Sequence, residues 1–187
     1  MDLKDFYLDK KRLVFIVIDM QEALVDAMKP GVVREIIRNI QLLIQVAKTF
    51  QIPIIFTEQY PKGLRKTVPP IREILGSLEP VEKVTFSCLK EEAFTEKISD
   101  DSLNQAVIMG METHVCVFQT VLDLLSRGYT VHVPRDATCS RVKQNWVTGL
   151  SLMEQAGALI TSAETIAFQL LEKAGTDAFR ALAPLLK

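Results

Sequence analysis

Hydrophobic residues along this chain gather in short continuous runs that are separated by longer amphipathic segments. The first run, over 13–19, contains six apolar residues and ends in an acid. Runs of this kind are typical of strands that are buried on both faces of a parallel sheet. On this basis we predict strands at the following positions: 13–19, 54–56, 81–86, 106–110, 129–133 and 158–161.

The segments between the predicted strands carry apolar residues at helical spacing. In the clearest of them, 32–50, these residues form one face of a helix. Thr113 is the predicted N-cap of a helix over 115–126, and Gly128 follows this helix where a C′ glycine belongs. Further helices are predicted over 90–98, 142–157, 164–175 and 176–187.

The order of these elements predicts one α/β domain over residues 1–187, with a mostly parallel sheet and helices on both faces. In such sheets ligands bind at the carboxyl ends of the strands. The segment 57–70 follows a strand, and its Gly and Pro content predicts a polar loop too long to be a mere connector. Function is therefore expected among residues that lie at or beyond the strand ends.

Composition and charge exclude several classes of protein. Of the 187 residues 48% are hydrophobic, so disorder is not expected. The net charge is -1, from 22 basic and 23 acidic residues, which argues against nucleic acid or an anionic membrane as a partner. The apolar run 13–18 is far shorter than the roughly 20 residues that span a bilayer.

The chain start and the cysteines predict a cytoplasmic protein. The first twelve residues are mixed in charge and lack the apolar stretch of a signal peptide. Three cysteines, an odd number, are expected to be free thiols in a reducing compartment.

Three reactive side chains fall at or near predicted strand ends: Asp19, Lys83 and Cys116. Taken singly, each has an ordinary interpretation, as a turn or cap residue, a solvated lysine and a buried thiol respectively. Asp19 and Cys116 both lie along the carboxyl edge if the sheet is parallel. They meet only if strands 13–19 and 106–110 are neighbours in that sheet.

Local chemistry favours an active thiol at Cys116. A thiol in the first turn of a helix lies near unpaired N–H groups, which are expected to lower its pKa, and a nearby lysine would lower it further. An aspartate in contact with both would hold the lysine and accept the thiol proton. Cys88 and Cys139 lack such a setting, and packing is the expected role of both.

Five sequence blocks resemble the isochorismatase-like cysteine hydrolases, which include nicotinamidases and N-carbamoylsarcosine amidohydrolases. The blocks occur in the family's order and cover nearly the whole chain: VFIVIDMQEAL (14–24), PIIFTEQYPKG (53–63), VEKVTFS (81–87), GMETHVCVFQT (110–120) and DATCSR (136–141). The second and fourth blocks look most like the isochorismatase-domain-containing subgroup, whose members mostly have no settled substrate.

The resemblance implies a catalytic triad of Asp19, Lys83 and Cys116. It also implies a six-stranded parallel sheet of order 3-2-1-4-5-6, in which strands 1 and 4 are neighbours, and an assembly of two or more copies. A cis peptide would join Met111 to Glu112 and aim the backbone N–H groups of Glu112 and Cys116 at a developing oxyanion.

The sequence departs from the metal-dependent members of that family. These carry an Asp-x-His pair and a further His in the loop after the second strand, whereas the matching segment 57–67 contains no His. The two histidines, His114 and His132, do not form a ligand set, so neither a catalytic metal nor another cofactor is expected. Nicotinamidase activity is disfavoured for this reason, and isochorismate hydrolysis because members that cleave that vinyl ether often lack the cysteine.

The function expected from these residues is hydrolysis of a small amide, ureido or related acyl compound through a thioester. Gln21, Gln59 and Tyr60 are candidates for contact with the substrate, although Gln21 is equally suited to capping the next helix and the other two to stabilising their loop. Two alternatives remain open at this stage. One is a catalytically silent binding or scaffold protein, and the other is a thiol redox sensor with Cys88 or Cys139 as its resolving cysteine.

Overall fold

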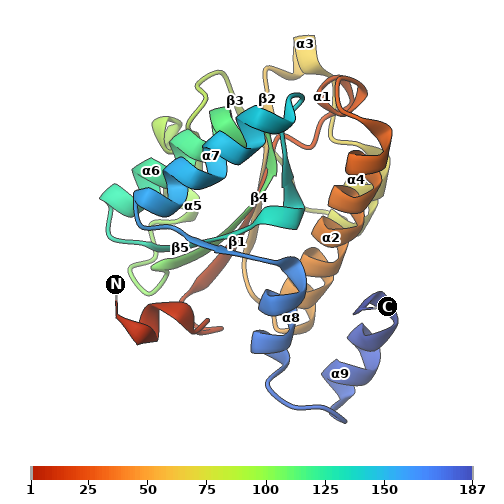
Figure 1. The fold of residues 1–187 in the computed structure, drawn as a ribbon, viewed down its shortest axis with the longest axis vertical. Coiled ribbons are helices and arrows are strands. Elements are labelled where there is room, and N and C mark those ends of the chain that lie inside the picture. Colours follow the sequence, from red (N-terminus) through yellow and green to blue (C-terminus); the bar gives the residue numbers. More distant parts are fainter. Residues whose placement is uncertain (1, 187) are drawn as a thin grey trace.

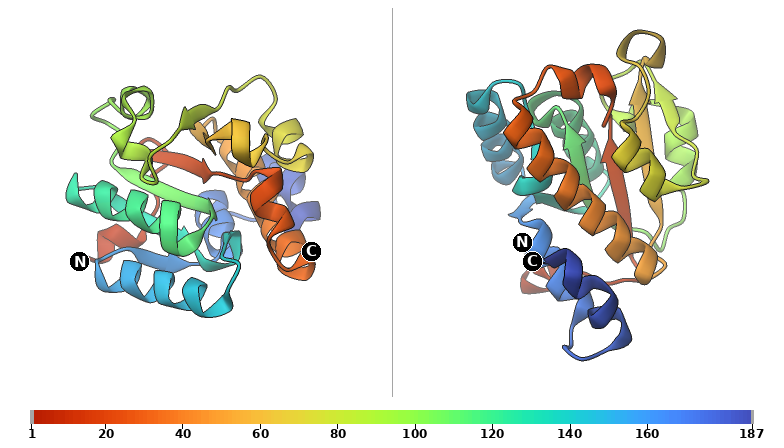
Figure 2. Two further views of the ribbon diagram at one scale, coloured as in Figure 1. Left: turned by 90° about the horizontal axis from the view of Figure 1, so that it is seen from above. Right: turned by 90° about the vertical axis from the view of Figure 1, so that its right-hand side faces the viewer.

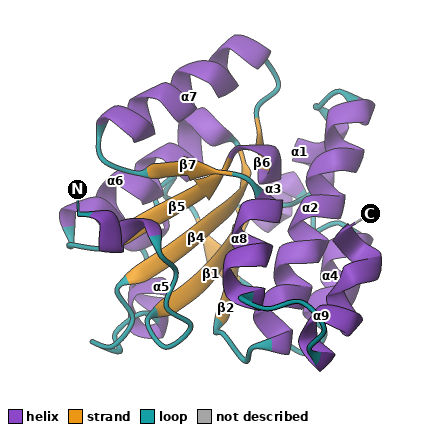
Figure 3. Ribbon diagram, turned by 60° about the horizontal axis from the view of Figure 1, so that its bottom comes forward, coloured by secondary structure: helices purple, strands orange, loops and turns teal. Residues whose placement is uncertain are grey.

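A parallel sheet separates two layers of helices in the computed structural model, which describes residues 2–186 (Figure 1). The strand order is β3-β2-β1-β4-β5-β7, and a short additional strand, β6, pairs with β4 (Figure 3). This confirms the predicted order, because β7 is the sixth of the predicted strands. The strands are β1 (Leu13–Ile18), β2 (Ile54–Gln59), β3 (Val81–Lys83), β4 (Gln105–Met111), β5 (Thr130–Pro134), β6 (Thr138–Cys139) and β7 (Leu159–Thr161).

Helices cover both faces of the sheet (Figure 2). On one face lie α2 (Pro30–Thr49), α4 (Pro69–Leu75), α8 (Ala163–Leu171) and α9 (Asp177–Leu182). On the other lie α5 (Glu92–Lys97), α6 (Phe118–Ser126) and α7 (Lys143–Gln155). Two short helices, α1 (Glu22–Asp26) and α3 (Pro61–Leu64), follow β1 and β2. No helix among residues 2–186 is both long and apolar enough to cross a membrane.

Burial on both faces explains why the sequence of strand β1 is apolar without interruption. Its six residues are all buried, and alternate side chains enter the two opposite cores. Phe15 packs on the α2 side, for example, and Ile16 on the α6 side. Full burial of one such side chain stabilises the fold by about 1.5–3 kcal/mol, so β1 anchors both layers.

Several predicted boundaries are wrong, among them the end of the strand at 81–86, which stops at Lys83, and the end of the helix at 164–175, which stops at Leu171. The segment 57–70 is not simply a loop, because β2 continues through Gln59 and two proline-led helices, α3 and α4, follow. The helix of 115–126 begins at Thr113 with a π-helical turn, Thr113–Val117, so Glu112 occupies the N-cap position. The predicted capping by Thr113 does not occur, and its buried hydroxyl has no hydrogen-bond partner among the described residues.

The chain end also differs from the prediction of one helix over 176–187. Helix α9 ends at Leu182, and a 3-10 turn, Ala183–Leu186, follows. Pro184 lies in this turn, and a proline lacks the N–H that would continue the α-helical hydrogen bonding. Residue 187 lies outside the described residues.

Close approach of β1 and β4 brings their carboxyl ends together. The two strands are in register over the whole length of β1, and Ile18 is opposite Gly110. Gly110 has a φ of 115°, and a Cβ there would lie 2.0 Å from the carbonyl oxygen of Ile18. Only glycine fits this position, which sets Asp19 beside the segment that leads from β4 to Cys116.

Candidate active site

Asp19 lies directly after β1 with its side chain fully buried and its backbone in the left-handed region, at a φ of 50°. One carboxylate oxygen, Oδ2, accepts a hydrogen bond of 2.7 Å from Lys83 Nζ. The other, Oδ1, accepts a bond of 2.6 Å from the Thr57 hydroxyl. The carboxylate is therefore fixed from two sides by groups on two other strands.

Lys83 ends β3 and directs its ammonium group into the same buried site. Besides the bond to Asp19, Nζ donates to Gln59 Oε1 at 2.6 Å and to the carbonyl oxygens of Thr85 and Phe86, each at 3.3 Å. Burial acts to lower the pKa of Lys83, but the charge and hydrogen bond of Asp19 together with the nearby thiols Cys116 and Cys88 outweigh it, so the net shift is upward. Lys83 is therefore a permanent cation.

Cys116 lies in the π-helical turn before α6 and is the most exposed member of the trio, at 6%. Burial raises the pKa of its thiol, the charge of Asp19 raises it further, and Lys83 lowers it. The expectation of a lowered pKa is wrong in net direction, because desolvation and the charge of Asp19 together outweigh the effect of the lysine. The resting group is a neutral thiol whose pKa is affected by the charges of both Asp19 and Lys83.

The side chain of Gln21 is hydrogen-bonded to backbone groups of the chain. Its side-chain nitrogen donates to the carbonyl oxygens of Gln59 and Arg65, at 3.0 and 2.7 Å, and its side-chain oxygen accepts from the Gln59 N–H at 2.7 Å. It stands at the N-cap position of α1, but its side chain makes no capping bond. Its amide therefore fixes the chain after β2 in place.

Gln59 and Tyr60 differ in their surroundings. Gln59 is buried and holds Lys83 through Oε1, while its Nε2 donates to the Val84 carbonyl at 2.8 Å. Tyr60 donates its backbone N–H to the Lys83 carbonyl at 2.8 Å, and its side chain is 54% exposed. Gln59 thus positions Lys83, and Tyr60 has a side chain that a ligand can reach.

The peptide bond between Met111 and Glu112 is cis, as the family resemblance implies. The Glu112 side chain is buried, and its carboxylate accepts from the Arg141 backbone N–H at 2.9 Å and from Arg141 Nε at 3.1 and 3.2 Å. The acid is therefore bonded to the loop that follows β6. Its backbone N–H remains the predicted oxyanion donor, together with that of Cys116.

Sequence reasoning missed Thr57 as a neighbour of the trio, and it considered Cys88 only as a packing residue or as a resolving cysteine in the redox alternative. The sequence predicts a loop at Thr57. However, Thr57 and Gln59 follow the run 54–56 two residues apart, which is the spacing of side chains on one face of a longer strand. Cys88 is fully buried, its pKa is raised to about 12 by burial, and it senses the charges of Lys83 and Asp19. Nothing in its spacing along the chain indicates this proximity.

The histidines are engaged in packing and hydrogen bonding. His114 Nδ1 lies 3.0 Å from the Ser140 hydroxyl, and its Nε2 lies 3.3 Å from Asn145 Nδ2. His132 is buried within β5, as expected of a strand-interior residue. Among residues 2–186 no group of three or more His, Cys, Asp or Glu side chains is arranged to hold a metal ion.

Comparisons with known proteins agree with this fold. The isochorismatase domain family matches residues 14–165. Isochorismatase domain-containing protein 2 of Xenopus laevis is 40% identical over 146 residues, which are 78% of this chain and 70% of that protein.

Solved structures are similar over almost the whole chain. The MAR1 ribonuclease of Caenorhabditis elegans is 34% identical with a TM-score of 0.88, and the match covers 96% of this chain and 92% of that one. The YcaC gene product of Escherichia coli, an octameric hydrolase of unknown specificity, shares the fold at 24% identity and a TM-score of 0.87, over 96% and 89% of the two chains. By sequence and by fold, the chain belongs to the isochorismatase family.

Proposed function

We propose that this protein is a cysteine hydrolase that cleaves a small amide, ureido or related acyl compound through a thioester intermediate. The observation that carries the proposal is the buried carboxylate of Asp19, which pairs with the Lys83 ammonium at 2.7 Å and acts on the Cys116 thiol. A base, a fixed cation and a nucleophile thus share one site, which is the arrangement that activates a thiol.

In the first half-reaction Asp19 removes the proton of the Cys116 thiol, and the sulfur attacks the carbonyl carbon of the substrate. The carbonyl electron pair moves onto oxygen, where the N–H groups of Glu112 and Cys116 stabilise the negative charge. In comparable sites one such donor contributes about 3 kcal/mol. Asp19 then returns the proton to the leaving nitrogen, the carbon–nitrogen bond breaks, and the amine departs.

In the second half-reaction Asp19 takes a proton from water, and the resulting hydroxide attacks the thioester carbon. The carbon–sulfur bond breaks, the acid is released, and the proton held by Asp19 returns to sulfur. The raised pKa of Lys83 keeps its charge constant throughout, so that one carboxylate serves as base and acid in turn. A resting neutral thiol suits this scheme, because the proton must be available for the leaving group.

Two exposed aromatic side chains near Lys83 are the proposed walls of the substrate site. Tyr60 and Phe86 are 54% and 53% exposed, and the backbone of each is hydrogen-bonded to Lys83. Gln21 and Gln59 act in this proposal by holding that backbone and the lysine. A homo-oligomer of two or more copies also remains part of the proposal, and Val142, Val147 and Leu152 on or next to α7 are exposed apolar residues suited to such a contact.

The test is a screen of simple amides and N-carbamoyl compounds for release of amine or ammonia. The wild type is compared with Cys116→Ala and with Cys139→Ala, which removes another buried thiol. We expect activity in the wild type and in Cys139→Ala, loss of at least about a thousandfold in Cys116→Ala, and an acyl adduct on Cys116 by mass spectrometry. Equal activity of Cys116→Ala and wild type would overturn the proposal.

The same variants separate the two alternatives from the hydrolase. A silent scaffold turns over none of the compounds and forms no acyl adduct. A redox sensor forms a disulfide between Cys116 and a second cysteine when exposed to peroxide. The raised pKa of the Cys116 thiol counts against the sensor, because the thiolate is the form that peroxide oxidises.

A further inference from the structure

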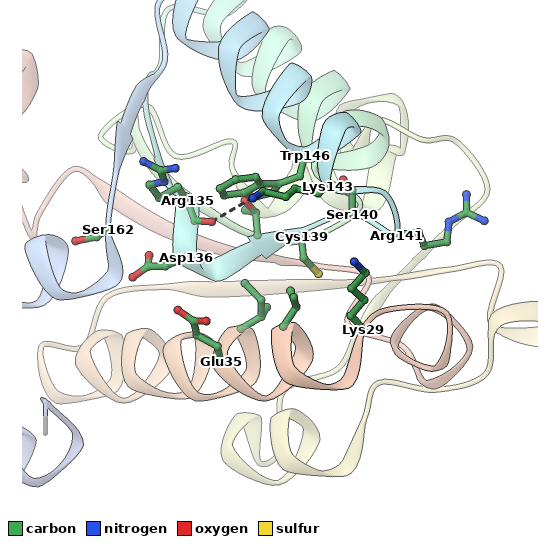
Figure 4. A pocket seen from close by; sticks show the side chains of 13 residues that line it. Lys29, Glu35, Arg135, Asp136, Cys139, Ser140, Arg141, Lys143, Trp146 and Ser162 are labelled. Carbon is green, nitrogen blue, oxygen red and sulfur yellow. Dashed lines mark hydrogen bonds between the residues drawn. The ribbon is translucent and has the colours of Figure 1, made fainter.

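A cavity of about 460 Å³ lies between the start of α2, strand β6 and the start of α7, and no member of the trio lines it (Figure 4). This volume falls in the range of roughly 300–1,000 Å³ that is typical of small-molecule sites. Its walls come from both helical layers. In Figure 4 Lys29 rises from the α2 side toward Cys139, and the Trp146 ring lies across the cavity on the α7 side.

Positive charge predominates around this cavity. Four basic residues line it, Lys29, Arg135, Arg141 and Lys143, against the two acids Glu35 and Asp136. Asp136 is engaged, since its Oδ1 accepts the backbone N–H of Ala163 at 2.8 Å.

The basic residues are for the most part not neutralised by acids of the chain. Arg141 is committed through Nε to Glu112. Lys29, Arg135 and Lys143 form no ion pair with an acid of residues 2–186, so their charges are available to an incoming anion.

Apolar side chains line the cavity on both helical sides, Trp146 on α7 and Val32 and Ile36 on α2. Trp146 is half-buried, and its indole nitrogen donates to the Arg135 carbonyl at 3.3 Å, which fixes the ring. The Arg135 guanidinium lies 5.3 Å from the ring centroid. Val32 and Ile36 on α2 complete an apolar surface. A flat hydrophobic group fits between these side chains.

We propose that this cavity is a second binding site, distinct from the Asp19–Lys83–Cys116 site, for a small aromatic anion. Its ring lies against Trp146 and its carboxylate faces Lys29 and Lys143. The proposal does not depend on the hydrolase activity, because it requires neither the trio nor a turnover.

The test uses the single tryptophan of the chain as a reporter. The protein is labelled with nitrogen-15, and the indole N–H signal of Trp146 is followed while naphthalene-2-carboxylate is added. We expect a saturable shift of that signal. Acetate has the charge without the ring, and naphthalene-2-methanol has the ring without the charge. Each should bind at least about tenfold more weakly, since the basic and the apolar side chains of the cavity both contribute to binding.

Variants locate the site. The double change Lys29→Met and Lys143→Met should weaken binding of naphthalene-2-carboxylate by about tenfold, because both exposed positive charges that face the carboxylate are lost. Lys97→Met, a change of an exposed lysine on α5, should leave it unchanged. Cys116→Ala should also bind normally, which separates this site from the catalytic one.

Several results would overturn the proposal. These are the absence of a saturable shift, equal binding of the alcohol and the carboxylate, unchanged binding in the double lysine variant, or loss of binding in Cys116→Ala. An indole signal that moves with protein concentration and not with naphthalene-2-carboxylate would assign the cavity to a contact between two copies of the chain instead.

Discussion

At the scale of single residues, Asp19 controls both of its reactive neighbours. Its charge raises the pKa of Lys83 against the effect of burial, and it adds to the effect of burial in raising the pKa of Cys116. In both cases a negative charge in a buried site favours the protonated form of the group beside it. The carboxylate thus favours a protonated sulfur, which is the starting state of the proposed mechanism.

This electrostatic assignment predicts the behaviour of Asp19→Asn, which keeps the shape and removes the charge. The pKa of Cys116 should fall in the variant, because the charge of Asp19 no longer adds to the effect of burial against that of Lys83. At a fixed pH near neutrality, alkylation of Cys116 by iodoacetamide should be faster, by about tenfold for each unit by which the pKa falls, because the thiolate fraction rises in that proportion. Hydrolysis should be lost, because the base is gone. Rates are measured by mass spectrometry of the peptide that carries Cys116.

Cys139 in the same variant is the internal control. Burial raises the pKa of this thiol to about 12, and Asp19 is not among the charges that act on it. Its alkylation rate should therefore be the same in the wild type and in Asp19→Asn. Slower alkylation of Cys116 in the variant would contradict the assignment of Asp19 as the group that raises its pKa.

At the scale of elements, the site depends on the close pairing of strands β1 and β4. Gly110 and Gly128 both have positive φ, 115° and 83°, but only Gly110 faces backbone where a Cβ would be added. Gly110→Ala should lose at least about 3 kcal/mol of folding free energy, from strain and steric overlap together. Gly128→Ala, with open space around it, should lose about 1 kcal/mol. Urea unfolding measures the loss of stability in both variants. Equal losses would contradict the close approach of β1 and β4 at Gly110.

Strand β5 contains a group that makes folding sensitive to acid. Burial lowers the pKa of His132 to about 4, from about 6.5 in an unfolded chain, against a weaker upward effect of Asp5. The neutral ring therefore contributes stability above pH 6.5 that is lost as the pH falls toward 4, by about 3 kcal/mol. The free energy of unfolding of His132→Leu should change less over this range than that of the wild type. Parallel curves for the two proteins would contradict this prediction.

The pattern of apolar residues predicted the strands better than their ends. The run 13–19 and strand β1 agree within one residue, because continuous burial on both faces leaves a clear signal. Strand β6 was not predicted, since two residues in a polar segment carry no periodicity. The π-helical turn before α6 was not predicted either, because it differs from an α-helix in hydrogen bonding and not in residue type.

At the scale of the whole molecule, the order of the strands in the sheet brings the residues of the site together. Asp19 and Lys83 are 64 residues apart in the chain and meet because β1, β2 and β3 are successive strands of one sheet. Residue spacing alone identified the strand ends but not which of them are neighbours. That information came from the resemblance to a family of known topology. The second cavity depends in the same way on α2 and α7 from opposite layers, which no local pattern reveals.

The balance of charge over the whole chain leads to a prediction about RNA. The similar protein of C. elegans is described as a ribonuclease, whereas this chain carries a net charge of -1. Proteins that grip a nucleic acid backbone gain most of their affinity by releasing its counterions, which takes an excess of clustered Lys and Arg. We therefore expect no salt-dependent binding of a labelled single-stranded RNA in a fluorescence anisotropy titration, and no cleavage above that of Cys116→Ala. Cleavage that Cys116→Ala abolishes would instead mean that the same thiol acts on a phosphodiester, and it would move the substrate from acyl compounds to RNA.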